Sequence, residues 1–401
     1  MQALLMAASE DLRMHPLTYT RPKAMLPLAN KPIMEHLLLE IKKAGIAEFL
    51  IVVGYHGEMV RDYFGTGERW GIHIEYITQR QQRGTASAVK RAECRVADRF
   101  LVINGDIVAR AKDIEQLVNA DKVTLMLTEV DNPSDLGAVE IEDNKIKRIQ
   151  EKTPEPSSRL VSAGMYLLTP DVFPSIESCR PSARGNYDLT DCLQHLIDSG
   201  YHVGYYTTDY WLNPDYPWDL LEANNDFLSK ARTTKNLAEI EDNVTIKGKV
   251  SIGKGTQVKS GCYIEGPVII GERCVIGPGC YLCPGTTIGN DCQIGGMVEI
   301  KNSIIMSICR VANHSFVGDS IIGEGCFIGS GAMTATIRLD GKNIKVAGID
   351  TGKQELGVIM GDKVQVGVNA SIDAGTIIGN NSLIGPGAEP NGVILPNSKI
   401  L

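Results

Sequence analysis

The chain has 401 residues, of which 43% are hydrophobic and 22% charged, and its formal net charge is −8 at pH 7. This length exceeds what one ordinary hydrophobic core covers, so two domains are expected. The negative balance argues against nucleic acid as a partner, and no uninterrupted apolar stretch predicts a membrane span. The opening residues turn polar at once and lack the basic region of a signal peptide, which favours a cytoplasmic protein.

Up to about Trp218, short apolar runs alternate with amphipathic segments. The apolar runs are Ala3–Ala8, Phe49–Gly54, Ile72–Ile77, Phe100–Ile103 and Val123–Leu127, and the amphipathic segments include Pro32–Ala44 and Ala86–Val96. Short buried strands separated by helices predict an α/β domain with a mostly parallel sheet covered on both faces. Ligands bind such sheets beyond the carboxyl ends of the strands, so the candidate site lies there.

From about Ile240 the pattern changes to a repeat of six residues. An aliphatic residue recurs at every sixth position from Ile240 to Ile300, eleven times in succession. After a break the period resumes at Ile322 and Ile328, and again from Val366 to Ile384. A hexapeptide repeat predicts a parallel β-helix, in which each coil buries its aliphatic residues against the next. We therefore predict an α/β domain over residues 1–232 and a β-helix over residues 233–401.

Half of the ten cysteines keep step with this repeat. Each lies two residues before a periodic aliphatic residue: Cys262, Cys274, Cys280, Cys292 and Cys326. Three hexapeptides, or 18 residues, make one coil. Cys262 should therefore stack with Cys280 on the neighbouring coil, and Cys274 with Cys292. We interpret them as small apolar side chains that fill the interior. A stack of disulfides or a metal site is the alternative, and it is disfavoured by compartment and burial.

The loop after the first apolar run carries the first candidate site. It reads Ala7-Ala8-Ser9-Glu10-Asp11-Leu12-Arg13, and Thr20-Arg21-Pro22-Lys23 follows. A loop that leaves a strand end can bind phosphates through its amides when cations stand nearby, and Arg13 and Lys23 would be those cations. The segment resembles the signature of sugar-1-phosphate nucleotidyltransferases, A-A-G-x-G-x-R followed by P-K. The resemblance implies that Arg13 and Lys23 are catalytic.

The same resemblance implies that Ala7, Ala8 and Ser9 bind the nucleotide, but two positions depart from the signature. Its glycines are replaced by Ser9 and Asp11. Glycine permits close backbone approach and positive φ. Asp11 adds a carboxylate near the expected triphosphate, and two like charges about 4 Å apart cost about 4 kcal/mol at an effective dielectric of about 20. We therefore expect weakened nucleotide binding unless Asp11 turns outward or holds a metal, and a solvated loop without ligand is the alternative.

Downstream segments resemble the same family in the same order. Gln79, Gly84 and Thr85 match its Q-x4-G-T segment, in which the glutamine amide reads a pyrimidine, so the resemblance favours UTP or dTTP. Asp106, at the end of an apolar strand, matches the family's magnesium ligand, and Asn213 stands where the second ligand is expected. The positions that match sugar-binding segments are Gly137, Glu151 and Ser162, the last where the family often has asparagine.

The pairing with a hexapeptide β-helix resembles archaeal bifunctional N-acetylglucosamine-1-phosphate uridyltransferase–glucosamine-1-phosphate acetyltransferases, which form UDP-N-acetylglucosamine. The resemblance covers nearly the whole chain and implies a Rossmann-like nucleotide-binding domain, a left-handed parallel β-helix, a homotrimer, and acetyl-CoA as a cofactor if the second domain is active. The family's catalytic histidine lies in an H-x-[ST]-Y-x-G-D segment. When Gly318-Asp319 is aligned with its end, Asn313 takes the histidine position and Phe316 the tyrosine position.

The remaining acetyltransferase candidates are His314, Lys342 and Lys345. His314 is displaced by one residue, which in a strand reverses the face. Thr336 replaces an asparagine, and the two lysines remain. Asparagine cannot act as a general base. We therefore expect weak or absent acetyl transfer and a β-helix that mainly assembles a trimer.

Together these features predict an Mg²⁺-dependent enzyme that joins a nucleoside triphosphate to a sugar-1-phosphate and releases pyrophosphate. Such a reaction needs positioning and charge neutralisation more than a protein nucleophile. Two alternatives remain open. One is a catalytically impaired regulatory homologue that binds a nucleotide-sugar. The other is a glucosamine-1-phosphate acetyltransferase that uses His314 as a relocated base.

Overall fold

The computed structural model describes residues 1–182, 185–230 and 238–401. They divide into two compact units. The first contains Met1–Glu10, Arg21–Met25 and Pro32–Asn213, and the second contains Asp11–Thr20, Leu26–Lys31 and Pro214–Leu401. The predicted boundary between residues 232 and 233 lies outside the described residues and stays a prediction. The loop Asp11–Thr20, which carries Arg13, groups with the second unit.

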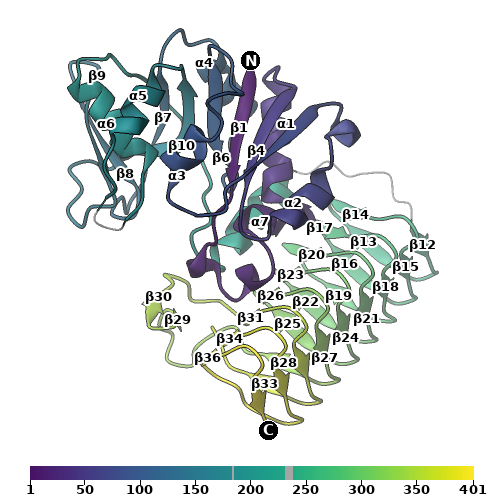
Figure 1. The fold of residues 1–401 in the computed structure, drawn as a ribbon. Coiled ribbons are helices and arrows are strands. Elements are labelled where there is room, and N and C mark those ends of the chain that lie inside the picture. The colour runs from purple at the N-terminus through teal and green to yellow at the C-terminus, as the bar shows by residue number, and fades with distance from the viewer. Residues whose placement is uncertain (183–184, 231–237) are drawn as a thin grey trace. The chain divides into compact units, whose positions relative to one another are not determined.

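The first unit is built on a mixed, mostly parallel sheet (Figure 1). Its main path runs β11-β7-β10-β6-β1-β4-β5. These strands are β1 (Gln2–Ala7), β4 (Glu48–Val53), β5 (His73–Thr78), β6 (Phe100–Asn104), β7 (Thr124–Glu129), β10 (Leu160–Leu168) and β11 (Gly204–Thr207). Strand β10 runs antiparallel to β6 and β7, and the hairpin of β8 (Gly137–Glu142) and β9 (Lys145–Glu151) attaches to it. All five predicted apolar runs form strands.

Helices cover both faces of this sheet. One face packs against α1 (Ile33–Lys43), α2 (Gly57–Phe64) and α4 (Ala111–Val118), and the other against α3 (Thr85–Lys90), α5 (Val172–Ser178) and α6 (Leu189–Asp198). Neighbouring residues of β1 serve the two cores in turn, with Leu5 in one and Leu4 in the other. A short 3-10 helix, η4 (Glu68–Trp70), follows α2. The predicted arrangement is confirmed.

One predicted helix is shorter than expected. The pattern of Ala86–Val96 predicts a helix throughout, but α3 ends at Lys90. Beyond it the chain turns more tightly, because the amide of Ala92 donates to the carbonyl of Val89 and that of Glu93 to Lys90, three residues back in each case. Such bonds are those of a 3-10 turn, and they divert the chain before the apolar pattern ends.

The second unit contains a β-helix of three parallel sheets (Figure 1). The first sheet consists of β12 (Glu239–Ile240), β15 (Gln257–Val258), β18 (Val275–Ile276), β21 (Gln293–Ile294), β24 (Arg310–Val311), β27 (Phe327–Ile328), β32 (Gln365–Val366), β35 (Leu383–Ile384) and β37 (Lys399–Ile400). The second consists of β13 (Thr245–Lys247), β16 (Tyr263–Glu265), β19 (Tyr281–Leu282), β22 (Glu299–Lys301), β25 (Phe316–Gly318), β28 (Met333–Thr334) and β33 (Ser371–Ile372). The third consists of β14 (Val250–Ile252), β17 (Val268–Ile270), β20 (Thr286–Ile288), β23 (Ile304–Ile305), β26 (Ile321–Ile322), β31 (Ile359–Met360), β34 (Ile377–Ile378) and β36 (Val393–Ile394).

The break in the six-residue period is a shortened coil and not an interruption. Ile270 pairs with Ile288, 18 residues on, but Ile288 pairs with Ile305 and Ile305 with Ile322, 17 residues on in each case. Loss of one residue per coil shifts the period in the sequence while the stack continues. A later insertion, residues 335–357, carries the hairpin of β29 (Lys345–Val346) and β30 (Ile349–Asp350).

Other short elements complete the second unit. They are α7 (Asp219–Lys230), β2 (Pro27–Leu28), and the 3-10 helices η1 (Leu12–Met14) and η2 (Leu17–Tyr19). Strand β3 (Lys31–Pro32) pairs with β2, and the 3-10 helix η3 (Lys23–Met25) belongs to the first unit. Asn224 of α7 is fully buried and accepts the amide of Ala29 at 2.8 Å, while its own amide donates to the carbonyl of Gly285 at 3.2 Å. This asparagine connects α7 to the turn after β2 and to the β-helix.

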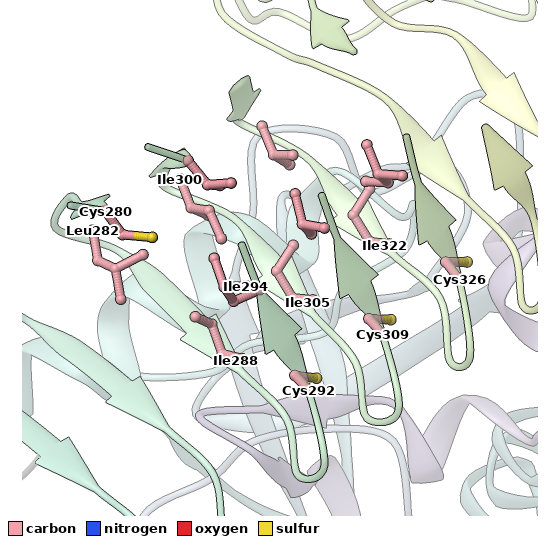
Figure 2. Close-up of a cluster of buried hydrophobic side chains, with 14 of the residues drawn as sticks. Cys280, Leu282, Ile288, Cys292, Ile294, Ile300, Ile305, Cys309, Ile322 and Cys326 are labelled. Atoms are coloured by element: carbon pink, nitrogen blue, oxygen red, sulfur yellow. The ribbon is translucent and has the colours of Figure 1, made fainter. Parts of the chain in front are cut away.

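The periodic aliphatic residues form the interior of the β-helix, as Figure 2 shows for successive coils. Ile240 and Ile246 are exceptions, because 42% and 37% of their surfaces are exposed. They belong to the first coil, which has a neighbouring coil on one side only. A repeat at the end of a stack cannot bury its aliphatic face fully. The expectation that every periodic residue is buried is therefore wrong at these two positions.

The cysteines of the β-helix lie in the same interior. All ten cysteines of the chain are free thiols, and those in step with the repeat are buried. Cys292, Cys309 and Cys326 stack on successive coils (Figure 2). Each thiol also donates to a backbone carbonyl of the next coil, with Sγ to oxygen distances of 3.2, 3.0 and 3.1 Å. The interpretation as interior filler is confirmed, and the thiols have a second use as weak hydrogen-bond donors.

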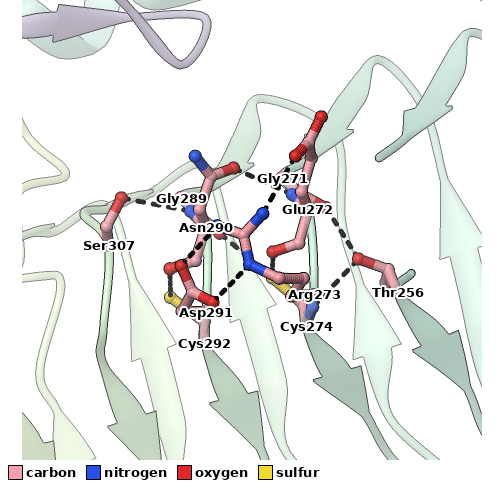
Figure 3. Close-up of polar contacts among 10 residues, drawn as sticks. All are labelled: Thr256, Gly271, Glu272, Arg273, Cys274, Gly289, Asn290, Asp291, Cys292 and Ser307. Atoms are coloured by element: carbon pink, nitrogen blue, oxygen red, sulfur yellow. Dashed lines mark hydrogen bonds and ion pairs between the residues drawn. The ribbon is translucent and has the colours of Figure 1, made fainter. Parts of the chain in front are cut away.

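One corner of the β-helix is held by side chains that bridge neighbouring coils (Figure 3). The side-chain oxygen of Asn290 accepts the amide of Glu272 at 2.8 Å, and the hydroxyl of Ser307 accepts the amide of Asn290 at 3.1 Å. Arg273 donates to both carboxylate oxygens of Asp291 at 2.7 and 2.8 Å. Each such residue supplies one rung between successive coils.

Candidate functional site

The candidate nucleotide residues of the first unit lie at the carboxyl ends of adjacent parallel strands. The amide of Tyr55, after β4, donates to the carbonyl of Ala8, after β1, at 3.0 Å. A Cβ on Gly54 would lie 2.7 Å from that carbonyl and 3.0 Å from the carbonyl of Gln79, so only glycine fits between these strand ends. The chain thus brings Ala7, Ala8 and Gln79 together at the position where α/β sheets bind ligands.

Gln79 and Gly84 form a compact turn, as their spacing predicts. Gln79 is 4% exposed, and its side-chain amide donates to the carbonyl of Gly84 at 3.4 Å. Gly84 has φ of +97°, and a Cβ there would lie 2.3 Å from the carbonyl of Tyr187. The hydroxyl of Thr85 accepts the amide of Leu189 at 2.8 Å. The glycine is therefore required by both its conformation and its neighbour.

Residues 187–190, at the start of α6, are a part of this site that sequence reasoning missed. Tyr187 accepts the amide of Ala86 at 2.9 Å, and its own amide donates to the carbonyl of Arg83 at 2.8 Å. The sequence contains one signal for it, since Asp188 precedes an apolar-periodic run and predicts the start of a helix. Nothing in the sequence relates that helix start to a segment about a hundred residues earlier.

Lys23, Asp106 and Asn213 meet in the first unit. The Lys23 ammonium lies 3.1 Å from Oδ2 of Asp106 and donates to Oδ1 of Asn213 at 2.8 Å. Only 3% of the Lys23 side chain is exposed, whereas 26% of the Asp106 side chain is exposed. Gly105, just before Asp106, donates its amide to the carbonyl of Met6 at 2.9 Å, which fixes this turn beside β1. The three residues predicted separately as catalytic cation and metal ligands therefore form one cluster.

This cluster fits an Mg²⁺ ion in its donor chemistry. A carboxylate oxygen and an amide oxygen converge on a single cation, the Lys23 ammonium, and both are hard donors of the kind Mg²⁺ binds. Among the described residues, no group of three or more histidine, cysteine, aspartate or glutamate side chains could hold a metal. Two protein donors suit an ion that takes its other ligands from water and substrate phosphates.

The loop that carries Arg13 belongs to the second unit, and its backbone tolerates the lost glycines. Asp11 has φ of −97°, an extended conformation open to any residue, and Ser9 does not adopt a positive φ either. The Asp11 carboxylate accepts the backbone amide of Arg13 at 3.1 Å and so caps η1. Arg13 donates to the Asp215 carboxylate at 2.8 Å. Asp11 thus has a local structural use.

The candidate sugar-binding residues Gly137, Glu151 and Ser162 lie near one another on β8, β9 and β10. A Cβ on Gly137 would lie 3.0 Å from Oε2 of Glu151, and the same carboxylate oxygen accepts the hydroxyl of Thr190 at 2.8 Å. Ser162 is buried and donates to the hydroxyl of Tyr166 at 2.8 Å. Burial raises the pKa of Tyr166 well above its usual value. Thr190 and Tyr166 extend the predicted set.

The acetyltransferase candidates of the second unit lie at a corner of the β-helix and on its insertion. Asn313 and His314 lie in a turn before β25 and are exposed, so the argument that one residue reverses a strand face does not apply to them. The side-chain oxygen of Asn313 accepts the amide of Gly296 at 2.8 Å, which is the same kind of rung that Asn290 supplies. His314 has φ of +59°. Lys342 and Lys345 are exposed on the insertion.

Phe316 and Thr336 lie against the same glycine. A Cβ on Gly318 would lie 2.6 Å from the Phe316 ring and 2.8 Å from the Thr336 methyl group. The two residues that replace the expected tyrosine and asparagine therefore pack together across Gly318, in the second sheet of the β-helix. Neither provides a base.

Comparison with known proteins gives the family. Residues 2–230 match the nucleotidyl transferase family, residues 264–349 match a domain described as the GMPPB C-terminal domain, and residues 356–395 match the hexapeptide repeat of succinyl-transferase. A bifunctional protein GlmU from a strain of Methanococcus maripaludis is 45% identical over 392 residues, which cover 96% of this chain and 93% of that protein. The chain therefore belongs to the sugar-1-phosphate nucleotidyltransferases of the nucleotidyl transferase family.

Two further similarities bear on this assignment. A bifunctional sugar-1-phosphate nucleotidylyltransferase/acetyltransferase from Sulfurisphaera tokodaii is 35% identical, over 98% of this chain and 97% of that protein. A crystal structure from Bacillus anthracis, assigned as a glucose-1-phosphate thymidylyltransferase, is 28% identical with a TM-score of 0.53, and covers 58% of this chain and 97% of that one. The predicted family, fold and enzyme class are confirmed. No helix in the described part of the chain is long and apolar enough to span a membrane.

Proposed function

We propose that the chain transfers a uridylyl or thymidylyl group from UTP or dTTP to a sugar-1-phosphate, with Mg²⁺ bound by Asp106 and Asn213. The observation that supports this most is the convergence of both residues on Lys23, beyond the ends of β1 and β6. The side-chain amide of Gln79, which contacts the carbonyl of Gly84, can both donate and accept hydrogen bonds, as recognition of uracil or thymine requires. The similarity to a protein assigned as a thymidylyltransferase agrees with a pyrimidine.

In this reaction an oxygen of the sugar-1-phosphate attacks the α-phosphorus of the nucleotide, and pyrophosphate leaves. Bound Mg²⁺ would neutralise charge on the phosphates and hold them in line. Lys23 is a buried ammonium beside the proposed metal ligands, so its charge is fixed and little hydrated when the phosphate arrives. Arg13 supplies the second cation, and Glu151, held by Thr190, faces Gly137 at the proposed sugar subsite.

Pyrophosphate release tests the proposal. The full chain with Mg²⁺ is assayed with UTP, dTTP and GTP, each paired with glucose-, N-acetylglucosamine- or glucosamine-1-phosphate. We expect turnover with UTP or dTTP and at least one sugar, abolished by chelation of Mg²⁺, and little with GTP. Nucleotide binding without turnover in any pair would contradict the proposal and favour the regulatory homologue, which is motivated by Ser9 and Asp11 in place of glycines.

For the β-helix we propose a role in assembling a homotrimer, with weak or absent acetyl transfer. Asn313 is occupied as a rung, Phe316 and Thr336 pack on Gly318, and an asparagine provides no base. Light scattering should give three times the 43.6 kDa mass of the chain. A robust rate of glucosamine-1-phosphate acetylation that is lost in His314→Ala would contradict the second part and support a relocated base.

A further inference from the structure

The loop Asp11–Thr20 carries a catalytic candidate, Arg13, but is packed within the second unit. One of its attachments is Arg13 itself, which donates to Asp215 at 2.8 Å. Asp215 is fixed in turn by α7, because the Asp219 carboxylate accepts the amides of Asp215 and Tyr216 at 3.0 and 2.8 Å. The beginning of the loop is therefore attached to the segment that leads into α7.

The end of the loop is attached to the β-helix. The hydroxyl of Thr20 donates to Oδ2 of Asp362 at 2.6 Å. Asp362 lies at the corner between β31 and β32, and only 6% of its surface is exposed. A hydrogen bond to a buried carboxylate is among the stronger ones, so this contact is a substantial restraint on the loop.

The Asp362 carboxylate can accept two hydrogen bonds, one on each oxygen, whereas the corresponding corner residue Asn290 has only one side-chain oxygen. Its Oδ1 accepts the amide of Glu324 at 2.8 Å, as Oδ1 of Asn290 accepts the amide of Glu272 at 2.8 Å (Figure 3). One oxygen is enough for the rung between coils. The second carboxylate oxygen, Oδ2, is then left to accept the hydroxyl of Thr20. An asparagine would present an NH₂ group at that place, and an NH₂ group only donates.

Between these attachments one side of the loop is buried, with Met14, Leu17 and Thr18 inaccessible, and the other side lines a cavity. Leu12, His15 and Tyr19 line a cavity of about 300 Å³, which Val346 and Ile349 of the inserted hairpin line as well. Empty space beside a chain segment removes the close contacts that would otherwise fix it. The polar attachments at the two ends therefore add to the packing of Met14 and Leu17 in restraining this loop.

We propose that Asp362 is a positioning residue for nucleotidyl transfer, which holds through Thr20 the conformation of the loop that carries Arg13. The inference rests on the proposed function. It gives the β-helix a part in the first reaction, because a corner of the β-helix fixes the conformation of the phosphate loop. The loop rejoins the first unit directly after Thr20, at Arg21, so a displaced Thr20 also changes the course of the chain toward Lys23.

The test compares Asp362→Asn and Thr20→Val with the control Asn290→Asp in the full chain. Asp362→Asn keeps the rung and removes the second acceptor, and Asn290→Asp makes the reverse exchange at an equivalent corner without a loop contact. We expect the KM for the nucleoside triphosphate to rise about tenfold in the first two variants, equivalent to about 1.4 kcal/mol. The KM for the sugar-1-phosphate should stay within about twofold. Thr20→Ser keeps the hydroxyl and should retain the wild-type KM, and the double variant should be no worse than either single one.

Amide hydrogen exchange of residues 11–20 gives a readout that does not depend on activity. Exchange should accelerate in Asp362→Asn and Thr20→Val and stay unchanged in Asn290→Asp. Unchanged exchange, an unchanged nucleotide KM, or additive effects in the double variant would overturn the proposal. If the wild-type chain shows no turnover, the proposed function fails separately, and the dissociation constant for UTP replaces KM as the measure of loop position.

Discussion

Lys23 has the environment of a fixed charge. Its ammonium is almost fully buried, and a carboxylate oxygen and an amide oxygen contact it at 3.1 and 2.8 Å. An ammonium withdrawn from water is retained only where acceptors replace its hydration. The arrangement keeps Lys23 in one place before substrate arrives, which is the condition under which a cation stabilises developing phosphate charge most effectively.

Removal of this charge should be severe. We expect Lys23→Ala to lower kcat/KM for nucleotidyl transfer by at least about 100-fold, the size typical for loss of one preorganised electrostatic group. The measurement is pyrophosphate release at saturating Mg²⁺. Lys43→Ala is the matched control, since that lysine is 65% exposed on α1 and pairs only locally with Glu40. A loss below tenfold would remove Lys23 from the catalytic set.

Asp11 combines a favourable and an unfavourable effect. Its carboxylate caps the Arg13 amide and lies 3.9 Å from the Arg13 guanidinium, so part of its charge is offset within the loop. If the loop binds phosphates as its signature predicts, the remaining charge opposes a triphosphate. We expect Asp11→Asn, which keeps the capping oxygen, to lower the KM for the nucleoside triphosphate several-fold, with a smaller effect at high salt.

The companion variant is Asp11→Gly, which removes the cap as well as the charge. It should gain less than Asp11→Asn, because loss of an N-cap costs about 1 kcal/mol of local stability. An Asp11→Asn variant with unchanged or raised KM would show that the carboxylate does not face the nucleotide.

At the scale of elements, the six-residue period predicts the β-helix well because each coil repeats the same burial. It does not predict where a coil loses a residue: Ile288 pairs with Ile305, 17 residues on, because Ile305 follows Ile300 by five residues and not six, at the corner where Asn302 has φ of +43°. Nor does it predict the corner bridges, since Asn290 and Asp362 look like ordinary surface residues. The fold of the first unit follows from its apolar runs in the same way.

The candidate site was predictable only in part. Gln79, Gly84 and Asp106 follow strands whose carboxyl ends must meet at one edge of a parallel sheet, so their proximity follows from the topology. Tyr187, Leu189 and Thr190 join the site through contacts such as that from Leu189 to Thr85, across 104 positions. Such contacts depend on how α6 packs, which no local pattern encodes. The membership of Asp11–Thr20 in the second unit is of the same kind.

The interior thiols of Cys274 and Cys283 should be chemically silent. The neighbouring Cys292 thiol and then burial hold the pKa of Cys274 well above its usual value, and burial raises the pKa of Cys283. Because the thiolate is the nucleophile, these groups should not react with a thiol reagent between pH 7 and 9. We expect fast labelling of the native chain at the exposed Cys94, lost in Cys94→Ser, and labelling of all ten thiols after denaturation. Rapid labelling of Cys274 in the native chain would contradict the closed interior.

At the scale of the molecule, the two candidate sites are unequal. The first unit brings the candidate cation, carboxylate and amide together in one cluster, whereas in the second Asn313, at the position where the motif predicts a histidine, is bonded to a neighbouring coil. The side chain of Asn313 bridges two neighbouring coils at its corner, so its replacement removes the hydrogen bond from the Gly296 amide. Each corner side chain bridges only its neighbouring coils, so a change at Asn313 should remain local.

The inequality can be tested by restoring the missing groups. We expect the double variant Asn313→His with Phe316→Tyr to raise acetyl transfer from acetyl-CoA to glucosamine-1-phosphate above the wild-type rate, because a histidine at an exposed turn titrates near neutral pH and can act as a base. The gain should appear as a rise in rate between about pH 6 and 7, where the imidazole loses its proton. Nucleotidyl transfer should be unchanged. Asn313 lies at a corner of the β-helix and Phe316 in β25, and among the described residues neither forms a hydrogen bond with the loop Asp11–Thr20. Asn313→Ala with Phe316→Tyr is the matched control, as it loses the same rung without gaining a base. A wild-type acetylation rate equal to that of the histidine variant would show that the second site already has a base, and would return His314 to consideration.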